Sequence, residues 1–357
     1  MVDDLYFNKL ESVVINPGFC VLCGSCSAFC NRISLDYDAG RPVLVKPCVK
    51  GCSNCYDHCP ITTDFDGNRV FGNSPRDEVL GAVTEIKAVR ATDPDAAGRG
   101  QDGGAVTAIL AAALKRGKID AAVVVERDSQ WRPIPRIITS EDELYTSAGS
   151  KYSPSPNIEE LGEIFRTLDL KSIAIVDVGC HIRAVRNLEF NLLYNAGFSP
   201  YSDLKIYTIG LFCSGSFGHG SLLNLLKTEP SSVRKMDIAK GKFSIESSDS
   251  VETRPVKEFE SAFLPSCPMC KDYGAELADL SIGSIASPEG YSTVVVRSLM
   301  GWGMLRDAVQ LGYVEADASL VDKEALKKSI ANKKKHAEKR IAAERAGKKA
   351  VPGFIPK

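Results

Sequence analysis

Cysteine is the residue type whose spacing carries most of the chemistry in this chain. Twelve cysteines are present. They fall into three groups of four: Cys20, Cys23, Cys26 and Cys30; Cys48, Cys52, Cys55 and Cys59; and Cys180, Cys213, Cys267 and Cys270. Disulfides are rare in a reducing cytoplasm, so cysteines grouped this closely in a cytoplasmic protein indicate metal binding.

The first two groups have the spacing of an iron-sulfur protein. They read C-x2-C-x2-C-x3-C and C-x3-C-x2-C-x3-C, and the second closes with Pro60. This pattern resembles the run of bacterial two-cluster ferredoxins, in which the fourth cysteine of each run ligates the other cluster. Carried onto this sequence, one [4Fe–4S] cluster takes Cys20, Cys23, Cys26 and Cys59, and the other takes Cys48, Cys52, Cys55 and Cys30. The alternative, a pair of zinc sites, typically has paired C-x2-4-C knuckles.

The third group is scattered along the chain. Cys180 follows the apolar run "AIVDVG", Cys213 follows "YTIGLF", and Cys267 and Cys270 form a C-x2-C pair. Sites gather at the carboxyl ends of parallel strands, so these four thiols could meet around a third cluster. A four-cysteine zinc site and buried thiols that act as small hydrophobic groups are the alternatives.

The elements that would position these residues follow from the apolar pattern. Runs at 119–126, 171–178 and 204–212 indicate buried strands, and helical patterns at 105–117, 183–197 and 220–228 alternate with them. Residues 232–262 suggest a small β-rich insertion, 278–298 a strand, turn and strand, and 64–83 a linker. We therefore expect an α+β ferredoxin-like domain with two clusters (1–75), an α/β flavin-binding domain with a mixed, largely parallel sheet (76–320), and a basic helical tail (321–357).

Composition and charge restrict the location and the partners. With 44% hydrophobic and 25% charged residues, only strand-sized apolar runs and an acidic first segment, the chain is expected to be cytoplasmic. Residues 323–357 carry 12 Lys and Arg against 3 Glu, a net charge of +9, and the rest of the chain carries −10. The tail is either a solvated helix or a docking arm for an acidic subunit or an anionic membrane surface. It has no interleaved aromatic residues, which disfavours nucleic acid.

A glycine-rich stretch precedes the helical pattern at 105–117. Gly103 and Gly104 come directly before it, and Thr107 lies one turn inside it. A helix that begins at glycines offers free N–H groups to a phosphate or to the polar edge of a flavin. A simple turn explains the same two glycines.

Five stretches together resemble the family of coenzyme F420 hydrogenase/dehydrogenase beta subunits. They are "GQDGGAVTAIL" (100–110), "GSKYSPSPNI" (149–158), "IVDVGCHIRAVR" (175–186), "GLFCSGSF" (210–217) and the stretch 266–298. One departure is "VDVGCHIRA", where many members have a Gly-Thr-Pro-Cys-Gln turn.

The resemblance implies that the chain binds FAD, exchanges a hydride with coenzyme F420 and holds a third [4Fe–4S] cluster. It gives a place in the FAD and F420 pocket to Gln101, Asp102, Gly103, Gly104, Thr107, Ser150, Lys151, Tyr152 and Ser153. Lys151 could meet a phosphate or be an ordinary surface lysine. Because the flavin carries the hydride chemistry, no catalytic side chain is required, although Asp102 and His181 could handle protons.

The resemblance, taken with the two-cluster run and the basic tail, implies an F420H2 dehydrogenase activity. Its electrons would pass to the hydrophilic arm of a complex I-like membrane complex of archaeal methanogenesis, on the inner face of the membrane, with methanophenazine or quinone as final acceptor. Alternatives are a free-standing F420H2:ferredoxin oxidoreductase, the input subunit of another redox complex, a flavin reductase with another donor, and a non-enzymatic electron carrier.

Overall fold

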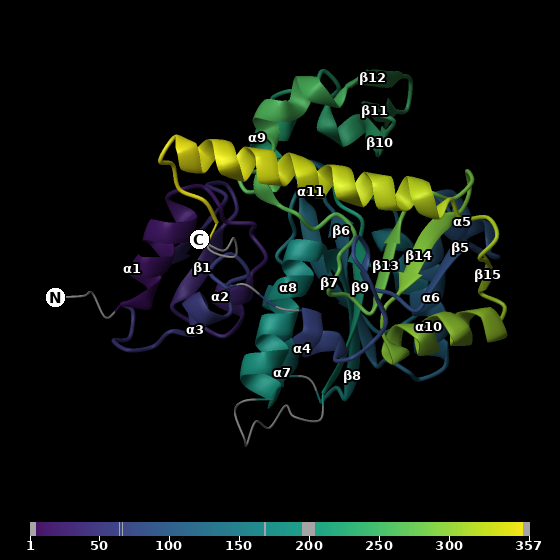
Figure 1. Cartoon of the computed structure of the whole chain (residues 1–357), viewed down its shortest axis with the longest axis horizontal. Coiled ribbons are helices and arrows are strands. Elements are labelled where there is room, and N and C mark those ends of the chain that lie inside the picture. Colours follow the sequence, from purple (N-terminus) through teal and green to yellow (C-terminus); the bar gives the residue numbers. More distant parts are fainter. Residues whose placement is uncertain (1–4, 64, 66, 168, 195–203, 353–357) are drawn as a thin grey trace.

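The computed structural model describes residues 5–63, 65, 67–167, 169–194 and 204–352. A cysteine-rich unit at residues 5–63, called the N-terminal unit below, lies beside a larger unit that is built on one sheet (Figure 1). A single long helix, α11 (Lys323–Ala346), runs across both units (Figure 1).

The N-terminal unit consists of short elements joined by cysteine-bearing loops. They are α1 (Tyr6–Leu10), η1 (Glu11–Ile15), α2 (Ser25–Ala28), β1 (Ile33–Asp36), β2 (Arg41–Leu44) and α3 (Asn54–Asp57). β1 and β2 form an antiparallel hairpin whose register runs from Ile33 opposite Leu44 to Asp36 opposite Arg41. Phe7 and Leu10 are each 2% exposed, so the first helix contributes to a small apolar core.

The larger unit is built on an eight-stranded sheet in the order β15-β5-β14-β13-β9-β8-β6-β7. The strands are β5 (Glu85–Ala91), β6 (Ala121–Arg127), β7 (Pro133–Ile138), β8 (Ser172–Val178), β9 (Lys205–Leu211), β13 (Leu280–Gly283), β14 (Ser292–Val296) and β15 (Val314–Asp317). The strands β6, β8, β9 and β13 are parallel, and the pairings outside them are antiparallel. The expected mixed sheet is present, but "largely parallel" was wrong, since parallel pairing is limited to these four central strands.

Helices cover both faces of the sheet. They are α5 (Pro94–Arg99), α6 (Ala105–Lys115), η2 (Asp142–Ser147), α7 (Asn157–Thr167), α8 (Gly179–Leu188), η3 (Glu189–Tyr194) and α10 (Leu299–Gln310). The short α9 (His219–Leu223) packs instead against the β-rich insertion. Along β8, Ile173 and Ile175 join the apolar core shared with α7 and α8, while Ala174 and Val176 join the core shared with α6 and α10. This alternation follows from the two-residue period of a strand, and each fully buried isoleucine contributes about 1.5–3 kcal/mol.

The predicted β-rich insertion is present as a separate antiparallel sheet. It contains β10 (Val233–Ala239), β11 (Lys242–Ser247) and β12 (Val251–Pro255), flanked by η4 (Pro230–Ser232), η5 (Val256–Ala262) and η6 (Cys267–Met269). The helix predicted at 220–228 is shorter than expected, because α9 ends at Leu223. The second predicted helix is present as α8, which passes into the π-helical η3 at Glu189. Residues 195–197 of the second prediction lie outside the described residues.

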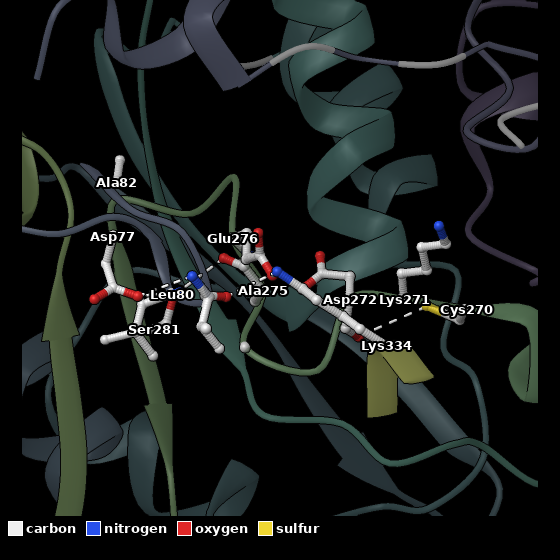
Figure 2. A network of polar contacts seen from close by, with 12 residues as sticks. Asp77, Leu80, Ala82, Cys270, Lys271, Asp272, Ala275, Glu276, Ser281 and Lys334 are labelled. Atoms are coloured by element: carbon white, nitrogen blue, oxygen red, sulfur yellow. Dashed lines mark hydrogen bonds and ion pairs between the residues drawn. The ribbon is translucent and has the colours of Figure 1, made fainter. Parts of the chain in front are cut away.

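The predicted linker is part of the packed structure. It contains α4 (Gly67–Phe71), β3 (Arg76–Asp77) and β4 (Gly81–Ala82). The fully buried Arg297 donates hydrogen bonds to the carbonyl oxygens of Leu80 and Ala82, at 2.5 and 2.7 Å, and to Ser281 Oγ at 2.7 Å. Figure 2 shows Leu80, Ala82 and Ser281 in this network. One charged side chain therefore connects the segment to the end of β14.

The basic tail helix α11 is bound to its own chain. Leu326 and Ile330 are fully buried in a core that includes Leu80 and Val295, and Ile341 joins the core of the N-terminal unit. Two ion pairs add to this, Lys327 with Asp77 at 2.7 Å and Lys334 with Glu276 at 2.7 Å. The helix is therefore not fully solvated, and whether its exposed side docks to a partner stays a prediction. None of the helices in the described part of the chain has the length and apolarity of a membrane span.

Replacing Ile330 by Asp should release α11 from the larger unit. Burying a carboxylate in this core costs several kcal/mol, so we expect trypsin to cleave the lysine-rich helix at least about 100-fold faster. Limited proteolysis followed by mass spectrometry measures this. The exposed neighbour Ala331 provides the matched control Ala331→Asp, which should leave the rate nearly unchanged. Equal cleavage of both variants would show that the buried face does not hold the helix.

Candidate functional site

The four cysteines of the predicted first set line one cavity. Cys20, Cys23, Cys26 and Cys59 surround it, together with Val21 and Ile61. The chain turns sharply between Cys23 and Cys26 because Gly24, the residue directly before α2, has a left-handed φ of 84°. Leu22 N–H lies 3.5 Å from the sulfur of Cys20.

The thiols of this set crowd one another in a buried space. Burial is the main reason that the pKa of Cys26 lies well above its usual range, and the nearby sulfurs of Cys20, Cys23 and Cys59 raise it further. Burial likewise raises the pKa of Cys59 to about 12. Thiolates can exist together here only if a positive charge compensates them, which is the situation of metal ligands.

The second predicted set gathers at the surface. Burial raises the pKa of Cys55 to about 12, and Cys48, Cys30 and Cys52 are the neighbouring sulfurs that add to the shift. Cys52 itself is exposed. The surrounding loop is exposed as well, with Val45 at 57% and Val49 at 47%. Cys30 of the first run therefore lies near this set, and its role as the fourth ligand stays a prediction.

The third set converges from distant parts of the sequence. Cys180, Cys213, Cys267 and Cys270 all line a second cavity, with Lys333 of α11 beside them. Cys180 lies in the first turn of α8 after β8, and Cys213 follows β9. Cys267 begins the short η6, and Cys270 comes directly after it. Burial raises the pKa of Cys180 well above its usual range, and the other three sulfurs raise it further. The carboxyl ends of parallel strands thus bring these thiols together.

The chemistry of the donors suits an iron-sulfur cluster, because each set consists of four cysteines. A structural zinc holds four ligands about 2.3 Å from one point. Among the described residues, no group of three or more His, Cys, Asp or Glu side chains is arranged to hold one metal ion. A four-iron cluster spreads its thiolates over four metal atoms, so the donor sets fit [4Fe–4S] chemistry.

The two cavities are neighbours. Val21 and Ile61 line both of them. His181, which is 1% exposed, connects the units between them: its Nδ1 lies 2.9 Å from Asp177 Oδ2, and its Nε2 lies 2.9 Å from the carbonyl oxygen of Val21. Burial opposes the charged imidazolium, but the carboxylate of Asp177 and both hydrogen bonds raise the pKa of His181. The side chain considered as a proton handler thus fixes the N-terminal unit to α8.

Most of the polar residues expected to contact flavin lie together near β10. Ser150 N–H donates to Gln101 Oε1 at 3.0 Å, and Gln101 Nε2 donates to Asp237 Oδ1 at 2.5 Å. The hydroxyl of Tyr152 accepts a hydrogen bond from Ile238 N–H at 2.9 Å. The sequence analysis missed Asp237 and Ile238 of β10, which bond to Gln101 and Tyr152. No motif or spacing in the local sequence marks these two residues.

Two further predicted residues, Asp102 and Lys151, have shifted pKa values. Burial and the charge of Asp237 raise the pKa of Asp102. Burial and the charge of Arg127 lower the pKa of Lys151 to about 7. Lys151 Nζ donates to the carbonyl oxygens of residues 147–149 at 2.6–3.0 Å, so it is not an ordinary surface lysine. Of the remaining predicted residues, Thr107 and Ser153 are buried.

The two glycines are required by the packing of the chain itself. A Cβ at Gly103 would lie 2.7 Å from the carbonyl oxygen of Val89, and a Cβ at Gly104 would overlap the carbonyl oxygen of Ala96. Gly104 also has a left-handed φ of 67°. The backbone packing and the turn at this position therefore explain both glycines without a bound ligand.

Comparison with known proteins places these features in a family. The family described as "Coenzyme F420 hydrogenase/dehydrogenase, beta subunit" matches through its N-terminal part at residues 86–161 and through its C-terminal part at residues 170–320. The coenzyme F420 hydrogenase subunit beta of Methanothermobacter thermautotrophicus is 38% identical over 74% of this chain and 96% of its own length. The chain belongs to the family of coenzyme F420 hydrogenase/dehydrogenase beta subunits.

Two further relatives linked to F420 align over most of the chain. One subunit of the F420H2 dehydrogenase of Methanosarcina mazei is 29% identical over 84% of this chain and 85% of its own length. A chain of the F420-reducing [NiFe] hydrogenase complex from Methanosarcina barkeri superposes with a TM-score of 0.72 at 30% identity, over 78% of this chain and 99% of its own. The two segments that the family matches lie between residues 86 and 320, so α11 and the N-terminal unit are outside them.

Replacing Gly104 by Ala should destabilise the fold whether or not flavin binds. A left-handed alanine costs about 1–2 kcal/mol, and the overlap with Ala96 adds to it. The matched control is Gly117→Ala, since Gly117 has a φ of 64° but nothing within 4 Å of its added Cβ. Thermal unfolding with and without added FAD measures the difference. If both variants have the same unfolding temperature without FAD and differ only when FAD is added, Gly104 is required for ligand binding and not for the fold.

Proposed function

We propose that this chain oxidises reduced coenzyme F420 and passes the electrons singly through its three cysteine sets to a partner. The observation that carries the proposal is the shared wall of the two cavities, formed by Val21 and Ile61. Cysteine sets in adjacent cavities can hold clusters close enough for electrons to pass from one to the next.

A flavin is needed between the donor and the clusters. Reduced F420 gives a hydride, which carries two electrons, and FAD when bound supplies the conversion from paired to single electrons. We place it near the polar group formed by Gln101, Ser150 and Tyr152, at the carboxyl ends of the parallel strands, where ligands bind in such sheets. The nearby ammonium of Lys151, held by three carbonyl oxygens, is the candidate partner of a phosphate.

The position of each cysteine set gives the order of transfer. The set at Cys180 belongs to the larger unit, which would carry the flavin site, so it would receive the electrons first. The set at Cys20 shares the wall of its cavity and comes second. The set at Cys48 includes the exposed Cys52 and comes last, so the electrons leave at the exposed loop 44–52.

Anaerobic mixing of the FAD-loaded, iron-replete chain with reduced F420, and separately with NADH, tests this proposal. Flavin bleaching and cluster absorbance should both fall with F420H2 alone. In the Cys267→Ser variant the flavin should still bleach, but the clusters of the N-terminal unit should stay oxidised, because the first cysteine set in the order of transfer is incomplete. Stopped-flow absorbance follows both events. A flavin-loaded sample that does not respond to F420H2 excludes this donor, and one that binds no flavin favours an electron carrier.

As for the partner, we propose the hydrophilic arm of a complex I-like membrane F420H2 dehydrogenase. The support is the likeness to the Methanosarcina mazei dehydrogenase subunit over most of both chains. The chain would then lie at the inner face of the membrane, with methanophenazine or quinone as final acceptor. Lys328, Lys335 and Lys339 are exposed on α11 and would face an acidic subunit.

Reversing the charge of these three lysines to Glu should weaken docking to the membrane-bound core of that dehydrogenase. Exposed ion pairs contribute about 0.2–1 kcal/mol each, so we expect a loss of affinity of about tenfold at low salt. Oxidation of F420H2 with an artificial acceptor should not change. Deletion of residues 323–357 is a poorer test, because it also uncovers the cores beneath α11. Docking that is unaltered by the three reversals would remove α11 from the interface.

A free-standing F420H2:ferredoxin oxidoreductase is the second candidate. The exposed loop 44–52 favours it, since a small exposed surface beside a cluster suits brief encounters with a mobile carrier. Saturable reduction of added ferredoxin without any membrane fraction would support this function.

A further inference from the structure

Lys333 reaches the third cysteine set from a part of the chain far away in sequence. Its Nζ donates a hydrogen bond to the carbonyl oxygen of Ser214 and lies 3.3 Å from the carbonyl oxygen of Cys267. The same side chain lines the cavity that holds Cys180, Cys213 and the C-x2-C pair. A cation therefore stands beside four sulfurs that would be thiolates as cluster ligands.

Two charged side chains line this cavity beside the cysteines and His181: Lys333 and Asp272. The carbonyl oxygen of Asp272 accepts a hydrogen bond from Cys270 Sγ at 3.6 Å. Lys333 is the one ammonium among the described residues that line the cavity, so it places positive charge where thiolate ligands would gather.

The helix holds Lys333 in place through its neighbours. Lys334 Nζ donates to the carbonyl oxygen of Val79 at 2.8 Å and pairs with Glu276, and Ile330 is fully buried one turn before. Figure 2 shows the pair of Lys334 with Glu276 and the contact of Cys270 with Asp272. The family match ends at residue 320, so this lysine comes from outside the matched region.

We propose that Lys333 raises the reduction potential of the cluster held by the third cysteine set, and that α11 must be seated for it to do so. The inference rests on the proposed third cluster. A reduced cluster carries one more negative charge than the oxidised one, so a fixed cation nearby favours reduction. Removing the cation should shift the one-electron equilibrium about tenfold, which corresponds to about 59 mV.

Redox titration of the full chain followed by electron paramagnetic resonance tests this. Lys333→Gln removes the charge but keeps an amide that can donate to the carbonyl oxygens, and Lys333→Arg keeps the charge. The exposed Lys335 provides the control Lys335→Gln on the same helix. Loss of a signal in Cys267→Ser identifies the third cluster. Iron analysis of the unaltered chain, together with the signal lost in Cys267→Ser, tests whether the third cluster exists. The reduction potential of that cluster tests the role proposed for Lys333.

The expected result is a lowered potential for the third cluster in Lys333→Gln, with the other two clusters unchanged and a near-normal potential in Lys333→Arg and Lys335→Gln. An unchanged potential in an iron-replete Lys333→Gln protein would overturn the proposal. So would an equal shift of all three clusters, or loss of the third cluster in Lys333→Gln alone, because the lysine would then serve assembly and not the potential.

Discussion

Crowded, buried thiols impose the constraint on which the rest of this structure depends. Burial raises the pKa of Cys23, Cys26 and Cys180 well above the usual range, and the neighbouring sulfurs raise it further. Such groups are compatible with a stable fold only as neutral thiols or as ligands of positive metal. The short elements of the N-terminal unit, and the cation that α11 adds to the third set, are both consistent with the second state.

The junction between the N-terminal unit and the body keeps the cysteine sets at a fixed separation. His181 connects α8 to the loop that carries Cys20 and Cys23. On the other side of that loop, α7 lies so close to α2 that any side chain at Gly162 would overlap the carbonyl oxygen of Ala28, to which Arg166 donates at 2.8 Å. The proposed electron transfer would need constant distances, and these polar contacts hold the two units together.

The net charge of the tail helix α11 gives no indication of the apolar face with which it packs against the rest of the chain. Its composition is strongly basic, yet Leu326, Ile330, Ala337 and Ile341 are buried along one side. These apolar residues recur at spacings close to multiples of the helical period, so they share a face although lysines outnumber them. The helix therefore binds both units of its own chain and leaves a set of exposed lysines on its outer side.

The sequence by itself determined the cysteine spacing of the N-terminal unit, which predicts cluster ligands, and the central strands β6, β8 and β9. Ligand spacing and a buried β-branched run are local properties, fixed by the covalent chain and the two-residue strand period. Only the tertiary structure decided the antiparallel edges of the sheet, the convergence of the third cysteine set, and the contacts of Gln101 with Asp237 and of Lys333 with Cys267. Those contacts join residues far apart in sequence, and they form only because particular faces of strands and helices bury against one another.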